Sequence, residues 1–169
     1  MTPADSDYLI RLASLSLSFV GFSSVVVTLR GALGGALSER HVRLVRLYIE
    51  GGFLVTALAL VPTMLDMLGI APAVTWPLAS AVAALIFTLV LVTQFRRRRA
   101  IEPGPFPFWV IVIYGISVVA VLRLWLNVVG WPQPSGVGAY AVVLTWALGL
   151  FGFIFVRTIE LFLLRSPQG

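Results

Sequence analysis

Hydrophobic residues along this chain come in five long, continuous blocks. A helix needs about 20 apolar residues, at about 1.5 Å each, to cross about 30 Å of hydrocarbon. Continuous runs of this length favour helices over strands, in which polar and apolar residues alternate. The pattern therefore predicts an all-α integral membrane protein, a single transmembrane domain over residues 1–169. The expected spans are residues 8–29, 47–70, 74–95, 108–129 and 139–163.

The connections between these spans alternate between basic and uncharged. The first, RGALGGALSERHVRLVR, and the third, RRRRAIEPGPFP, are rich in arginine. The second, APA, and the fourth, GWPQPSGVG, carry no charge. Because basic loops stay on the cytoplasmic side, this alternation predicts a five-helix bundle with its N-terminus outside and its C-terminus inside. Seven arginines are expected to contact anionic lipid headgroups there: Arg40, Arg43, Arg46, Arg96, Arg97, Arg98 and Arg99.

The segment SERHVRLVRLYIE, residues 38–50, is expected to form a basic cytoplasmic helix. Ser38 suits the N-cap, and arginines three residues apart share one face. Two arrangements remain open, because the helix either lies on the membrane or extends the second span. Gly51-Gly52 is the natural place for a bend between the two.

Composition supports a membrane location and limits the chemistry. Of the 169 residues, 59% are hydrophobic and only 11% are charged, which leaves no room for a separate soluble domain. The net charge is +5, but the arginines lie beside apolar spans, so we expect lipid contacts and no nucleic acid. There is no cysteine and a single histidine, His41. Thiol chemistry and multi-histidine metal or haem sites are therefore not expected, and no cofactor, metal or catalytic residue is predicted.

Charged residues inside predicted spans are the main functional candidates, because they are costly in lipid. Several have an opposite charge three or four residues away, so they are expected to anchor the helix ends: Asp7 with Arg11, Arg46 with Glu50, and Arg157 with Glu160. An enzyme is not expected, since no histidine or lysine lies in a span to activate a serine.

Asp66 and Arg123 lack such a partner within their own helices. Both fall in the outer third of their spans, so we predict that they pair across the bundle, with Asn127 able to hydrogen-bond the arginine. Pro62 should kink the second span beside this acid. Two interpretations remain open: the pair is a structural clasp, or it belongs to a transport pathway.

Ser14, Ser18 and Gly21 share one face of the first span. Small residues allow helices to approach closely, and serine hydroxyls can bond between helices. This face is therefore expected either to pack against another helix or to line a narrow polar pathway in a homo-oligomer.

Three stretches carry a resemblance: SFVGFSSVVVTLRGALGG, RLVRLYIEGGFLVTALALVP and GLFGFIFVRTIELFL, together about a third of the chain. The chain resembles a set of small uncharacterised bacterial membrane proteins. The resemblance implies an inner-membrane protein of a family without an assigned activity, and it supplies no catalytic residues.

Two functional hypotheses follow. The first, which the sequence favours narrowly, is a small oligomeric channel or transporter for an ion or small solute, with cytoplasmic arginines attracting anions. The alternative is a non-catalytic accessory or scaffold membrane protein that binds lipid or another membrane protein. The permeant species and the protein partner are not identified by the sequence.

Overall fold

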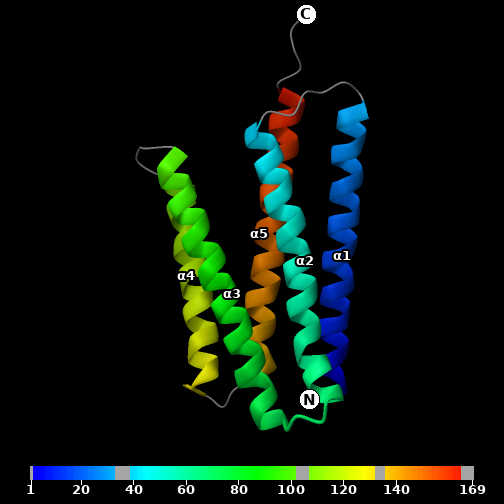
Figure 1. Ribbon diagram of the computed structural model, residues 1–169, viewed down its shortest axis with the longest axis vertical. Helices are drawn as coiled ribbons and strands as arrows, with labels where there is room; N and C mark the ends of the chain where they lie inside the picture. Colours follow the sequence, from blue (N-terminus) through cyan, green and yellow to red (C-terminus); the bar gives the residue numbers. More distant parts are fainter. Residues whose placement is uncertain (1, 33–38, 102–106, 132–135, 165–169) are drawn as a thin grey trace, which may run out of the picture. The chain divides into compact units, whose positions relative to one another are not determined.

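A computed structural model describes residues 2–32, 39–101, 107–131 and 136–164 (Figure 1). Within these residues the side chains at 30–32, 39–41, 43, 100–101 and 161–164 are not described. All the regular structure in the described ranges is helical. The helices are α1 (Pro3–Ala32), α2 (Glu39–Met67), α3 (Pro72–Ile101), α4 (Phe108–Val128) and α5 (Val137–Leu164). All five are long and apolar enough to span a membrane, which confirms the predicted all-α membrane class.

Helix α2 contains most of the basic segment 38–50. It begins at Glu39 and continues without interruption to Met67, so this segment is continuous with the second span, and its place relative to the membrane stays a prediction. The chain stays helical through Gly51 and Gly52. Pro62 lies inside α2 and is buried, and the kink expected there stays a prediction.

The chain divides into two compact units. The first unit contains residues 61–143, with α3, α4 and the adjoining ends of α2 and α5. The second unit contains residues 2–60 and 144–169, with α1 and the larger parts of α2 and α5. Since α2 and α5 each contribute to both units, the single transmembrane domain stays a prediction.

Contacts in the second unit fix the directions of its three helices. Along α1 and α2, Ser16 contacts Gly52 and Phe19 contacts Tyr48, so the numbers run in opposite senses and the helices are antiparallel. The Tyr48 and Phe155 rings meet as well, at a centroid distance of 5.2 Å.

Helices α1 and α5 are parallel. Tyr8 is bonded to Thr145, and Phe19 further along α1 contacts Phe155 further along α5. The start of α1 and the end of α5 therefore lie at opposite ends of this unit, as they should if the spans alternate in direction.

Buried positions in the second unit recur at three- and four-residue spacing. This is the spacing at which side chains interlock between helices packed nearly parallel or antiparallel. On α1 the buried residues are Leu9, Leu12, Ala13, Ser16, Val20 and Ser23. On α2 they are Tyr48, Gly51, Gly52, Val55, Leu58 and Ala59, and on α5 they are Leu144, Ala147, Phe151, Phe155 and Thr158.

Two adjacent glycines of α2 touch two different helices. A Cβ atom on Gly51 would overlap the Phe151 ring of α5, whereas one on Gly52 would overlap a methyl group of Val20 on α1. The absence of a side chain therefore lets both neighbours approach the α2 backbone at the same level. The Ser16 hydroxyl uses this approach to donate to the Gly52 carbonyl at 2.8 Å.

The first unit is built on an antiparallel pair formed by α3 and α4, which lie side by side in Figure 1. Their contacts run in opposite senses along the chain. The Phe95 and Tyr114 rings are 5.8 Å apart, and the Trp125 indole donates to the Thr88 hydroxyl at 3.4 Å. Small buried residues on α3 allow this packing: Ala79, Ser80, Ala83 and Ala84.

Helices α2 and α4 end in the same way. Gly69 and Gly130 have φ angles of 74° and 69°, a left-handed conformation that favours glycine. After α2, Gly69 donates to the Asp66 carbonyl and Ile70 to the Leu65 carbonyl. After α4, Gly130 and Trp131 donate to the carbonyls of Asn127 and Leu126. Both ends are thus Schellman motifs, which satisfy carbonyls in the last turn of the helix.

We expect Gly51→Ala and Gly52→Ala each to lower the free energy of unfolding by about 1–3 kcal/mol, because the added methyl group overpacks a helix contact. The measurement is unfolding in mixed micelles with increasing sodium dodecyl sulfate, followed by circular dichroism.

Gly149→Ala is the matched control, since a Cβ at Gly149 in α5 meets no atom within 4 Å. It should leave stability unchanged or raise it by up to about 1 kcal/mol through helix propensity. Equal stability of all three variants would contradict the close approach.

Candidate functional site

Asn127 is the most connected polar side chain described in the first unit, and it is only 3% exposed. Its amide nitrogen donates to the Ser80 hydroxyl at 2.7 Å and to the Gly136 carbonyl at 3.2 Å. Its amide oxygen accepts from the Gly136 backbone N–H at 3.2 Å. The side chain therefore joins α4, α3 and the residue before α5. We call Asn127, Ser80 and Gly136 the asparagine clasp.

Buried aromatic and hydroxyl groups occupy the same unit. The Trp76 and Tyr140 rings are 6.2 Å apart, and both residues are buried. Thr75, next to Trp76, donates its hydroxyl to the carbonyls of Ile70 and Ala71, each at 3.3 Å. Trp76 thus packs inside the unit, while Trp131 is exposed, as an interfacial tryptophan would be.

Arg123 finds a partner on the turn that follows its own helix. Its guanidinium donates to the Trp131 carbonyl at 3.3 Å, and the residue is half-buried. A cation near the C-terminal end of a helix also compensates the partial negative charge of the last carbonyls. This contact gives Arg123 a structural role at the end of α4.

Asp66 lies in the last turn of α2 and is exposed. Its predicted pairing with Arg123 stays a prediction. The hydrogen bond expected between Asn127 and Arg123 also stays a prediction, and the Asn127 amide bonds Ser80 and Gly136. Sequence reasoning missed both of these partners. The available signal was a polar residue three positions before the helix-ending Gly130.

The predicted small-residue face of α1 lies on the exposed side of the chain. Ser14, Ser18 and Gly21 are all exposed, and the two hydroxyls donate to the Ile10 and Ser14 carbonyls of the same helix. The buried serines are Ser16 and Ser23 instead. Packing within the chain therefore uses a different face, and a role for the exposed one in an oligomer stays a proposal.

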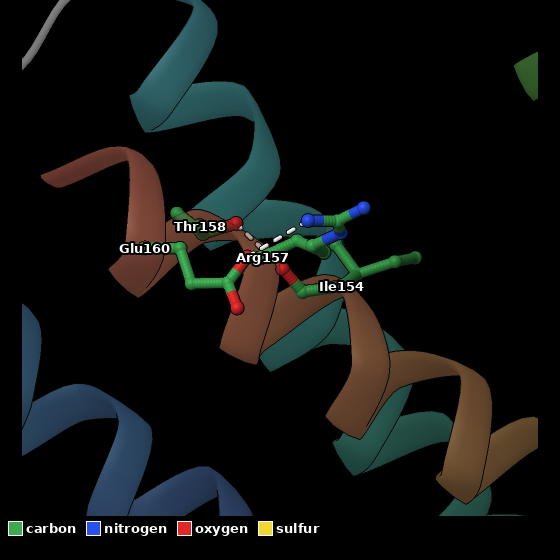
Figure 2. Close-up of polar contacts among 4 residues, drawn as sticks. All are labelled: Ile154, Arg157, Thr158 and Glu160. Atoms are coloured by element: carbon green, nitrogen blue, oxygen red, sulfur yellow. Dashed lines mark hydrogen bonds and ion pairs between the residues drawn. The ribbon is translucent and has the colours of Figure 1, made fainter. Parts of the chain in front are cut away.

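The three expected ion pairs are present. Asp7 bonds Arg11, Arg46 bonds Glu50, and Arg157 bonds Glu160. Figure 2 shows Arg157 and Glu160 on α5. The Arg157 Nη1 and Glu160 Oε2 atoms are 2.9 Å apart. The neighbouring Thr158 hydroxyl donates to the Ile154 carbonyl of the same helix. Each pair is largely exposed, so its contribution to stability is small.

The arginines predicted to contact lipid are only partly described. The side chains of Arg40 and Arg43 lie outside the described residues. The four consecutive arginines, residues 96–99, form the last turns of α3. Arg98 is half-buried, with its guanidinium 6.0 Å from the centre of the Trp109 ring on α4.

Among the described residues, no cluster of histidine, cysteine, aspartate or glutamate is arranged to hold a metal ion. Comparison with protein-family models, with curated proteins and with solved structures gives no match. The contacts within the chain are therefore the basis for proposing a function. They join helices inside each unit and hold charges at helix ends.

We expect Asn127→Ala to lower the free energy of unfolding by about 1–3 kcal/mol, because it removes the partner of the Gly136 backbone groups. Ser117→Ala on the same helix is the control, since that hydroxyl donates to the Ile113 carbonyl, an acceptor within α4. It should change stability by less than about 0.5 kcal/mol. Detergent-induced unfolding measures both, and similar values would argue against the clasp.

Ser16→Ala should cost about 0.5–1.5 kcal/mol, because the buried hydroxyl bonds the backbone of another helix. Ser14→Ala should have almost no effect on the monomer, since its hydroxyl bonds its own helix. The same unfolding assay compares the two. A larger effect at Ser14 would place the important contact on the exposed face, as in an oligomer.

Proposed function

We propose that this chain is a non-catalytic accessory or scaffold protein of the bacterial inner membrane, binding anionic lipid. The proposal is carried by the hydrogen-bond and charge partners of the polar side chains in this chain. Three of the buried polar side chains, Ser16, Ser80 and Asn127, take part in bonds that join helices, as in the asparagine clasp and in the bond from Ser16 to Gly52. Charged side chains sit towards helix ends, where they contact acids, a carbonyl or aromatic rings.

In the proposed orientation the arginine-rich ends face the cytoplasm, with the N-terminus outside and the C-terminus inside. The start of α2, the end of α3 and the end of α5 all carry arginine. Lipids of the cytoplasmic leaflet are anionic and attract such residues at about 1 kcal/mol each. Of these helix ends, the last turns of α3 carry the longest run of consecutive arginines, residues 96–99.

A small oligomeric channel or transporter is the second candidate, and one observation favours it. The exposed face of α1 that carries Ser14, Ser18 and Gly21 would be available to other copies of the chain. Several such faces could surround a narrow polar pathway.

Ion flux into liposomes that contain the purified protein separates the two functions. The scaffold predicts no flux above empty liposomes for wild type, Asp66→Asn or Arg123→Gln at matched folded amounts. Arg123→Gln should lower stability by about 0.3–1 kcal/mol, because it removes the cation that caps α4. Flux that either substitution alters in folded protein would contradict the scaffold and establish a pathway.

A further inference from the structure

Aromatic rings hold two of the four consecutive arginines at the end of α3. The Arg98 guanidinium lies 6.0 Å from the centre of the Trp109 ring, and that of Arg99 lies 5.2 Å from the centre of the Phe95 ring. Phe95 in turn meets the edge of Tyr114 at 5.8 Å. We call these five residues of α3 and α4 the arginine–aromatic cluster. Arg96 and Arg97 are exposed and belong to no ring contact described here.

Such ring contacts orient a guanidinium for a phosphate. The ring touches the flat face of the group, while phosphate oxygens bind its N–H edge, often in pairs. One arginine can therefore make both contacts at once. A ring that already fixes the side chain also lowers the entropy lost when the anion binds. Consecutive residues Arg98 and Arg99 thus bring two guanidinium groups that contact rings to one end of the α3–α4 pair.

The surroundings indicate a ligand that is partly buried in the membrane. Phe108 is 80% exposed and Trp109 is 50% exposed at the start of α4, beside the cluster. Exposed aromatic residues at the end of a spanning helix favour the level of the lipid headgroups. Residues 96–102 contain four arginines and one glutamate, which leaves a net charge of +3. The expected ligand therefore combines acyl chains with a negatively charged phosphate.

We infer that the arginine–aromatic cluster binds the phosphate diester of an anionic membrane phospholipid, with Arg98 and Arg99 as the specific donors. This inference rests on the proposed function and deepens it. It assigns selectivity for anionic lipid to Arg98 and Arg99, the two arginines that contact rings, rather than to the total charge of the last turns of α3.

Lysine substitutions test this distinction, because they keep the charge but lose the planar N–H edge. The protein is reconstituted in phosphatidylcholine vesicles, and electron spin resonance measures the association of spin-labelled phosphatidylglycerol relative to spin-labelled phosphatidylcholine. We expect this preference to fall about two- to fivefold in Arg98→Lys and in Arg99→Lys. Arg96→Lys and Arg97→Lys are the matched controls and should keep the wild-type preference.

Trp109→Leu tests the same site in a second way, because it removes the ring that contacts Arg98 without changing the charge of the protein. It should lower the preference about as much as Arg98→Lys. All variants are compared at equal folded amounts, judged by circular dichroism. If the four lysine variants all keep the wild-type preference, the cluster is not a specific site, while the general attraction of the scaffold to anionic lipid stands.

A wild-type protein without any preference for phosphatidylglycerol would overturn both the cluster and the lipid part of the proposed function. Inorganic phosphate distinguishes the source of the ligand. It is added in excess, against chloride at equal ionic strength. Unchanged preference supports a lipid headgroup, whereas its loss in phosphate alone would overturn the lipid assignment in favour of a free phosphate.

Discussion

The contact of α2 with two helices at once sets the geometry of the second unit. Neighbouring residues on a helix point about 100° apart, so Gly51 and Gly52 face two different neighbours at one level. Phe151 fills the space at the first glycine, and Val20 fills the space at the second. In lipid there is little hydrophobic force to press helices together, so association depends on close packing and on hydrogen bonds. Both occur here, because the Ser16 hydroxyl reaches the Gly52 carbonyl.

Polar side chains elsewhere differ in whether their hydrogen bonds join two helices. Many serine and threonine hydroxyls donate to the carbonyl four residues earlier and stay within their own helix, as Ser18, Ser117 and Thr158 do. Such a bond satisfies the hydroxyl but joins nothing. Ser16 and Asn127 bond another helix or a turn instead. Asn127 is suited to the backbone of Gly136, because its amide offers one donor and one acceptor side by side.

The sequence predicted where the helices lie but not which of their faces are buried within the chain, for one physical reason. Length and hydropathy mark a span whatever it touches, so all five helices lie where apolar runs placed them. In a membrane, however, the surface facing lipid is as apolar as the core. Leu15 and Phe22 are 61% exposed in α1, and nothing in their residue types separates them from buried Leu9. Spacing of small residues therefore indicated Ser14 and Ser18, whose role in an oligomer stays a prediction, whereas Ser16 and Ser23 are the serines of α1 that are buried within the chain.

Local pairing was predictable where both partners lie on one helix turn, and all three such ion pairs form. Contacts with residues beyond the end of a helix were not predictable, because they depend on how the chain reverses direction there. Arg123 is the clearest case. Considered along its own helix it has no partner, yet the left-handed Gly130 turns the chain so that the Trp131 carbonyl comes within 3.3 Å. An apparently isolated charge in a span therefore says little until the end of its helix is known.

The chain contains arginine but no lysine, and the surroundings of its arginines differ along the chain. Arg46 and Arg123 bind oxygen atoms through their N–H edges. Arg157 bonds Glu160 and also lies 5.8 Å from the centre of the Phe153 ring. The guanidinium groups of Arg98 and Arg99 lie 6.0 Å and 5.2 Å from the centres of aromatic rings. Because carboxylates, carbonyls and rings constrain a guanidinium in different ways, equal charges at the helix ends have unequal surroundings.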